Sequence, residues 1–222
     1  NVRENYLGSA SRAEDGAMVV IDRVSDFAAN HIWPLLATHE QPMAKLNRAF
    51  APAVRTRASE VLSEEHLRAL GETAAARAEM LAAVESINER SNCSDFRVTY
   101  TPELGYPAET IARMERRARR DRGEDCPRVT LREARAIDRA SVVFQSKKGL
   151  RPALEALVAW LSGGVMVHEA KHVADDARFD GLDNPLRCPG CPQRLGTSAR
   201  AEMSAYLSSF AHGPARVVNL FQ

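Results

Sequence analysis

Apolar side chains recur at steps of three and four through the first ninety residues, which is the spacing of one buried helix face. One stripe covers residues 18–35, and Pro34 is expected to end or kink that helix. A second stripe covers residues 67–87, where Ser63 is placed to cap the start and Gly71 is a point at which the helix can split. Both stripes predict helices that pack into a core.

Two shorter segments carry the pattern of strands. Residues 96–101 alternate apolar and polar side chains, and residues 141–145 form a short apolar run before a turn. Between them, a basic helix is expected over residues 109–122, and Thr130 with Glu133 forms a capping box that starts another helix. The pattern predicts a predominantly α-helical α+β fold with a small sheet.

Composition and charge narrow the class of protein. The 222 residues include 30 Lys and Arg against 29 Asp and Glu, a formal net charge of +1, so neither nucleic acid nor an anionic membrane is the expected partner. The arginines of 109–122 have no interleaved aromatic residues and are interpreted as a solvated helix face. The longest apolar run, 153–167, is interrupted and too short to span a bilayer, so a soluble protein is expected.

The four cysteines bear on the compartment. An even count favours two disulfides and an oxidising compartment, although it also permits a metal site. Cys188 and Cys191 are interpreted as closing a turn, with Cys93 and Cys126 as the other bridge, and the crossed pairings stay open. The chain begins at Asn1, as a processed or trimmed chain does, and its basic residues are mostly arginine, which is typical of a G+C-rich bacterial genome. We therefore expect a secreted or periplasmic bacterial protein.

The chemically informative segment is His168-Glu169-Ala170-Lys171-His172, an H-E-x-x-H pattern. On a helix, His168 and His172 lie one turn apart on the same face, so that their ring nitrogens can converge on one cation. Glu169 is offset round the helix, too far to ligate beside both histidines but able to reach a water molecule on that cation. The apolar residues before His168 are compatible with a helix in which these side chains are presented together.

This segment resembles the active-site helix of the zincin metallopeptidases, and the resemblance covers about a quarter of the chain. Lys171 departs from it, because zincins usually have uncharged residues between the histidines. Asp175 and Arg178 stand where the metzincin branch would have Gly and His or Asp, so the gluzincin branch, with a third ligand on a later helix, is the better match. The resemblance implies zinc and a zincin-like catalytic half.

Glu202 is the expected third zinc ligand. It lies 30 residues after His172 in a helix-forming segment, and no other acidic residue follows Asp183. Asp180 and Asp183 are rival ligands. A loose similarity to aspzincins, which have Gly-Thr before an acidic ligand and a Tyr, points to the same segment.

Two further roles are expected around the metal site. Tyr206, one turn beyond Glu202, and His212 are candidates to stabilise the oxyanion formed during peptide hydrolysis. Asp175 or Asp176 is a candidate to accept the second ring N–H of His172. The expected function is a zinc-dependent metallopeptidase, acting on a peptide or protein substrate, with Glu169 as the general base.

Two alternatives are weighed against this function. A di-iron carboxylate protein needs a second E-x-x-H, and no other histidine has a Glu three residues before it. A non-catalytic helical binding module would make the motif degenerate and the N-terminal helices the working surface. The expected division is an N-terminal helical region, 1–92, and a zincin-like metallopeptidase region, 93–222, which can also form one continuous domain.

Overall fold

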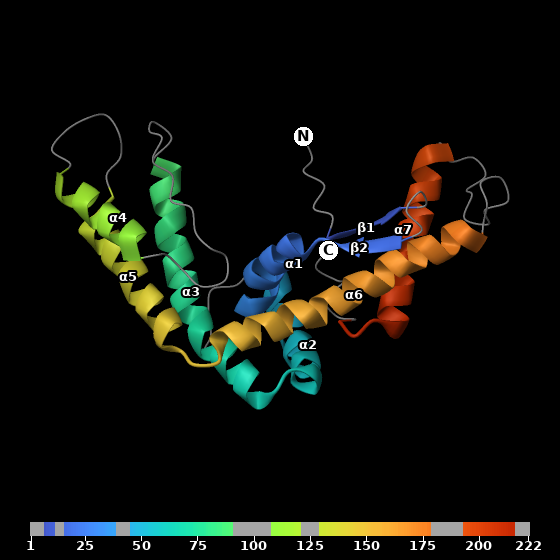
Figure 1. The fold of residues 1–222 in the computed structure, drawn as a ribbon, viewed down its shortest axis with the longest axis horizontal. Helices are drawn as coiled ribbons and strands as arrows, with labels where there is room; N and C mark the ends of the chain where they lie inside the picture. Colours follow the sequence, from blue (N-terminus) through green and yellow to red (C-terminus); the bar gives the residue numbers. More distant parts are fainter. Residues whose placement is uncertain are drawn as a thin grey trace. The chain divides into compact units, whose positions relative to one another are not determined.

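The computed structural model of the chain describes residues 7–11, 16–38, 45–90, 108–120, 129–178 and 193–215. These residues are predominantly helical with one small two-stranded antiparallel sheet, as the sequence predicted (Figure 1). In chain order the elements are β1 Gly8–Ser11, β2 Gly16–Val19, α1 Ile21–Phe27, a π-helical turn Ala28–Ile32, a 3-10 helix Trp33–Leu36, α2 Lys45–Val61, α3 Glu64–Arg90, α4 Ala108–Arg120, α5 Leu131–Ser146, α6 Leu150–Arg178 and α7 Gln193–His212.

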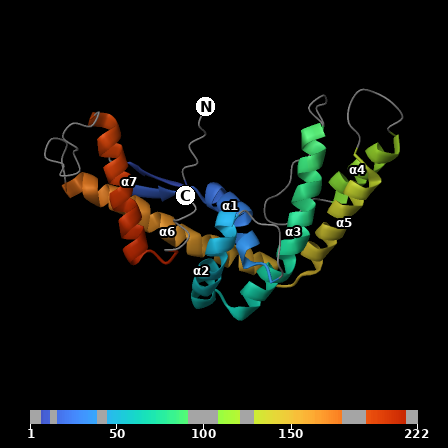
Figure 2. The same ribbon diagram turned by 180° about the vertical axis from the view of Figure 1, so that it is seen from behind.

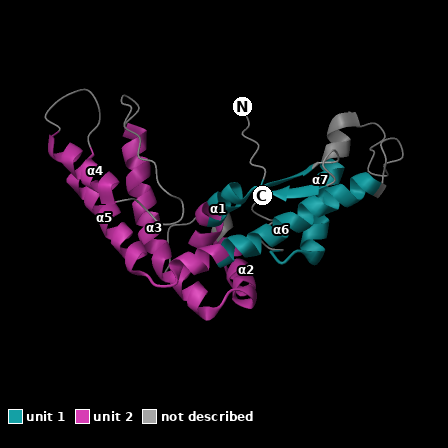
Figure 3. Cartoon of the chain, in the orientation of Figure 1, with its two compact units in different colours: residues 1–28, 156–222 teal, residues 29–155 magenta. Residues whose placement is uncertain are grey.

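The chain forms two compact units (Figure 3). Unit 1 combines residues 1–28 with 156–222, and unit 2 consists of residues 29–155. Unit 1 therefore contains the hairpin β1–β2, α1, most of α6 and α7, and unit 2 contains α2 to α5 with the first residues of α6. The expected boundary at 92/93 falls in the segment 91–107, outside the described residues.

Helix α5 lies between α3 and α4 in unit 2, as the view from behind shows (Figure 2). The 3-10 helix packs against α2 and α3, and its Trp33 is 1% exposed. The Trp33 Nε1 donates to the carbonyl oxygen of Leu70 at 2.8 Å, and the Phe144 ring lies 6.0 Å from the Trp33 ring. A buried indole needs such an acceptor, and this hydrogen bond satisfies the Trp33 N–H inside the core.

Helix α3 is continuous through Gly71, so the expected split does not occur. Its start is as predicted, because the Ser63 hydroxyl accepts from the backbone N–H of His66 at 3.2 Å. A Cβ at position 71 would lie 2.7 Å from Thr38 Cγ2 and 3.0 Å from the Leu36 carbonyl oxygen. The glycine therefore permits a close approach of the preceding segment to the helix rather than a break in it.

The prediction of one helix over residues 18–35 is wrong in part. Met18 belongs to β2 and is 54% exposed, and the helical backbone begins only at Ile21. From Ala28 it changes to a π-helical turn and then to a 3-10 helix that contains Pro34 and ends at Leu36. Pro34 thus marks the end of the helical segment, as predicted, because proline cannot donate to an α-helical ladder.

The prediction of a strand at residues 141–145 is also wrong, because these residues lie in α5. Ser141 and Phe144 are buried, whereas Val142 and Val143 are exposed, which continues the helical spacing of Ile137 and Ala140. A short apolar run has no period of its own to separate strand from helix. The other expected strand, 96–101, lies outside the described residues.

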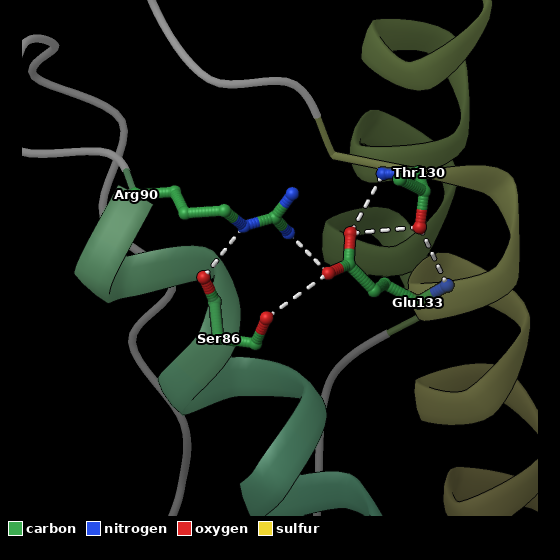
Figure 4. Close-up of polar contacts among 4 residues, drawn as sticks. All are labelled: Ser86, Arg90, Thr130 and Glu133. Carbon is green, nitrogen blue, oxygen red and sulfur yellow. Dashed lines mark hydrogen bonds and ion pairs between the residues drawn. The ribbon is translucent and has the colours of Figure 1, made fainter.

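The predicted capping box at the start of α5 is confirmed (Figure 4). Thr130 Oγ1 accepts from the N–H of Glu133 at 3.2 Å, and Glu133 Oε2 accepts from the N–H of Thr130 at 2.8 Å. The Glu133 carboxylate also accepts from Arg90 and Ser86 of α3. Burial raises the pKa of Glu133, but these hydrogen bonds outweigh it and hold the pKa below its ordinary value. The network joins the end of α3 to the start of α5.

Helix α6 differs from the other described helices in being long and apolar enough to cross a membrane. Core helices of soluble proteins have the same length and apolar composition. Leu157, Leu161 and Val165 of this helix are buried in the structure. The absence of membrane insertion stays a prediction.

Candidate functional site

The H-E-x-x-H segment lies in the second half of α6, on a continuous helix as predicted. Glu202 lies on α7, the later helix on which it was expected. Both helices belong to unit 1, where the two views agree in placing α7 across α6 (Figures 1 and 2). Glu202 and Ser204 of α7 contact His168, His172 and Asp175 of α6, and Ala205 of α7 is fully buried.

Three ligand atoms converge between these helices. The Nε2 atoms of His168 and His172 are 3.2 Å apart. Glu202 Oε2 lies 3.2 Å from His168 Nε2, and the other oxygen, Oε1, lies 3.5 Å from His172 Nε2. The histidine side chains are largely buried, at 13% and 16% exposure, whereas that of Glu202 is 47% exposed. The structure thus brings together the three residues that the sequence nominated as metal ligands.

The spacing of these atoms fits one metal ion. A cation bound tetrahedrally at about 2.0–2.1 Å separates its ligand atoms by about 3.3–3.4 Å, and the 3.2 Å between the two Nε2 atoms is close to that value. Glu202 Oε2 lies at the same 3.2 Å from His168 Nε2, and one ligand atom from each of the three residues lies within 4.8 Å of the others. Two imidazoles and one carboxylate suit a borderline divalent ion, and the Glu202 side chain is half-exposed. His168, His172 and Glu202 could therefore hold a metal as the three ligands that the described residues offer.

His168 is suited to act as a neutral ligand. Burial lowers its pKa, the neighbouring His172 lowers it further, and the carboxylate of Glu202 opposes both effects only in part. A neutral imidazole offers the lone pair that a metal requires. The Nδ1 atom of His168 is buried and has no hydrogen-bond partner among the described residues.

Glu169 lies beside the metal ligands and is only 8% exposed. Burial raises its pKa and the negative charge of Glu202 adds to this effect, whereas His172 opposes it. Its carboxyl group therefore binds a proton more readily than an exposed glutamate does. That property suits a group that takes a proton from water and passes it on.

The hairpin β1–β2 is a part of the site that the sequence did not reveal. A Cβ at position 8 of β1 would lie 2.7 Å from Glu169 Cγ and 2.8 Å from its Oε1, so the strand backbone lies directly against this side chain. Glycine inside a strand often marks such a close approach. The helical spacing of the apolar residues in 18–35 concealed the hairpin. The glycine at position 8 was the signal in the sequence for a close approach of the strand to another side chain.

We expect a Gly8→Ala variant to be less stable than the wild type by about 1–3 kcal/mol, because the added methyl group overpacks the contacts with Glu169 and with the backbone carbonyl oxygen of Met18, 2.8 Å from the added Cβ. At a site with space, the same change would stabilise by about 0.4–1 kcal/mol, since alanine restricts the unfolded chain. Urea denaturation measures the difference, and Ser9→Ala in the exposed neighbouring position is the control. A Gly8→Ala protein that is as stable as the wild type would contradict the close approach.

Tyr206 joins the cluster, whereas His212 does not. The Tyr206 ring lies edge-on to His168 with the ring centroids 4.6 Å apart. Burial raises the pKa of Tyr206, and the negative charges of Glu202 and Glu169 raise it further, so its hydroxyl stays a donor. His212 is exposed at the end of α7, ten residues and about 15 Å of helix beyond Glu202, which places it away from the ligands.

Lys171, the departure from the zincin pattern, pairs with Asp175 one turn later on the same helix. Asp175 is 6% exposed and also accepts from the Ser204 hydroxyl of α7 at 2.8 Å. Burial raises the pKa of Asp175, but the hydrogen bonds from Lys171 and Ser204 outweigh it and the pKa is lowered. Asp175 thus has partners other than the His172 ring N–H proposed for it, and Asp176 is exposed.

Several candidates lie outside the described residues. These are the rival ligands Asp180 and Asp183 and all four cysteines, so the two expected disulfides stay a prediction. The choice of Glu202 rests on its position beside both histidines.

Comparison with known proteins found no matching family model, no matching curated protein and no matching solved structure.

Proposed function

We propose that the protein is a zinc-dependent hydrolase of peptide bonds. The observation that carries the proposal is the convergence of His168, His172 and Glu202, whose ligand atoms lie within 4.8 Å of one another. Glu169, next to the first of these ligands on α6, supplies the carboxylate that a hydrolytic metal site requires. An ordinary structural zinc site is closed by four protein ligands, whereas the described part of the chain offers three here.

Zinc, when bound, supplies Lewis acidity that lowers the pKa of water towards about 7 and polarises a carbonyl group. His168 and His172 contribute neutral nitrogen ligands from one face of α6, and Glu202 contributes the one negative charge from α7. A site with a single anionic ligand keeps a net positive charge, which favours the approach of a carbonyl oxygen. The half-exposed side of Glu202 is the direction from which a substrate can enter.

Glu169 acts as the general base in this proposal. Its carboxylate accepts a proton from the attacking water and returns it to the leaving amine, so that the proton balance of the hydrolysis closes. Burial keeps this side chain in place beside β1, which limits the reorganisation needed during the proton transfer. The position of Glu169 one residue after a ligand keeps it close to the metal without occupying a ligand position.

Tyr206 acts as a hydrogen-bond donor to the developing oxyanion. Its ring packs edge-on against His168, and its hydroxyl keeps its proton at neutral pH because its pKa is raised by burial and by Glu202 and Glu169. A donor held in place before the reaction stabilises negative charge that forms only in the transition state.

Metal analysis combined with a general protease assay tests the proposal. We expect about one zinc per chain after zinc loading and dialysis, and zinc-dependent cleavage of fluorescein-labelled casein. Removal of the metal by 1,10-phenanthroline should abolish cleavage, and added zinc should restore it. A protein that stays metal-free when zinc is supplied would overturn the proposal, and a zinc-loaded protein without cleavage would restrict it to a metal-binding role.

A further inference from the structure

Asp175 joins the two helices that carry the candidate metal ligands. It is 6% exposed, lies three residues after His172 on α6, and accepts a 2.8 Å hydrogen bond from Ser204, two residues after Glu202 on α7. Its other carboxylate oxygen accepts from Lys171. Because a buried carboxylate is costly unless it is paired and hydrogen-bonded, both of its contacts matter for the folded state.

The contact between Asp175 and Ser204 lies where it can control the position of Glu202 relative to the two histidines. Successive residues on a helix are about 100° apart, so the buried Ala205 lies between Glu202 and Ser204 around α7. Around α7, Glu202 contacts the histidines on one side of Ala205, and Ser204 contacts Asp175 on the other side. Because the two contacts lie on opposite sides of Ala205, they limit rotation of α7 about its own axis and sliding of α7 along α6.

The need for such a contact follows from how the ligands are distributed. His168 and His172 share one helix, so the α-helix itself sets their spacing, whereas Glu202 reaches them only through the packing of α7 on α6. His168, His172 and Asp175 lie in one row on α6, at i, i+4 and i+7. The Asp175–Ser204 hydrogen bond thus extends the ligand row by one turn and ties it to α7.

We propose that Asp175 and Ser204 are positioning residues that hold Glu202 in register with the histidines, with Lys171 fixing the orientation of the Asp175 carboxylate. This inference rests on the metal site proposed above. It also explains why a lysine stands between the two histidines, since Lys171 serves Asp175 and not the metal.

Zinc affinity of purified full-length variants tests the inference, measured by competition with a chromophoric chelator. We expect Ser204→Ala and Asp175→Ala each to bind zinc about 10–100-fold more weakly than the wild type, the range usual when a group that orients a metal ligand is removed. Asp176→Ala removes an exposed neighbouring carboxylate, and Ser208→Ala removes a hydroxyl one turn later on α7. Both controls should stay within about twofold of the wild type.

Two further variants and a measurement of stability separate positioning from a merely structural role. Ser204→Thr keeps the hydroxyl and should restore near-wild-type zinc affinity. The Asp175→Ala/Ser204→Ala double variant should bind zinc no more weakly than the single variant with the lower affinity, because both substitutions remove the same hydrogen bond. Urea denaturation of the metal-free proteins measures how each substitution changes the free energy of unfolding, separately from its effect on zinc affinity. If Asp175→Ala does not fold, Ser204→Ala and Ser204→Thr carry the test.

The outcomes distinguish the two proposals. Folded Ser204→Ala and Asp175→Ala proteins that bind zinc as tightly as the wild type overturn the positioning role and leave the metal site intact. A wild-type protein that binds no zinc overturns the proposed function itself, and the positioning role falls with it.

Discussion

Replacement of Glu169 by glutamine is expected to lower kcat/KM for peptide hydrolysis by about 10²–10⁴-fold, the usual contribution of a general base. The amide has nearly the shape of the carboxylate but cannot accept a proton from water at neutral pH. Because Glu169 lies beside the ligands and is not one of them, zinc content should stay at the wild-type level. Casein cleavage and metal analysis on the same preparation measure both effects.

The matched control is Glu155→Gln, the same change at an exposed position of the same helix. It should retain wild-type cleavage and zinc content. A Glu169→Gln protein with full activity would refute the role of Glu169, whatever its zinc content. A loss of both zinc and activity would instead place Glu169 among the groups that maintain the metal site.

Removal of any one of the three ligands is expected to weaken zinc binding at least about 100-fold, beyond the range usual for outer-shell partners. His168→Ala, His172→Ala and Glu202→Ala each leave two ligands from one tetrahedral set. The effect should also appear in stability, because zinc at 100 times its Kd stabilises a folded protein by about 2.7 kcal/mol. Urea denaturation with and without zinc should show this increment in the wild type and not in the variants.

His212→Ala is the control for the ligand variants. It removes a histidine from the same helix as Glu202, at an exposed position ten residues further on, and should leave zinc affinity unchanged. Zinc binding that survives all three ligand substitutions would show that the metal binds elsewhere on the chain. Loss of zinc in His212→Ala would contradict the position of that residue outside the cluster.

Local sequence signals located most of the helices. The Ser63 cap, the Thr130–Glu133 capping box and the regular apolar spacing of α3 all involve residues within a few positions of one another. Where such signals were weak, the expectation failed, as for residues 141–145 in α5. A capped helix that is already formed adds one hydrogen bond per residue, so it extends through a short apolar run that would fit either structure.

The β1–β2 hairpin shows the opposite limitation. Its strands are four residues each, too short for a clear period, and Met18 in β2 coincided with the helical spacing of the residues after it. The contact of Gly8 with Glu169 joins positions 161 residues apart in the chain. No local pattern encodes a contact of that range, so the strand beside the candidate base became visible only in the folded chain.

The sequence alone determined the histidine pair of the candidate site. An α-helix places residues i and i+4 on one face whatever surrounds it, so His168 and His172 had to lie together, with Glu169 beside them. The tertiary structure decided the rest: that Glu202 meets both histidines, that Tyr206 packs on His168 while His212 lies away, and that Asp175 bonds Ser204. These outcomes depend on the rotation and register of α7 against α6. Tertiary packing sets both of these, whereas the spacing of residues along the chain does not.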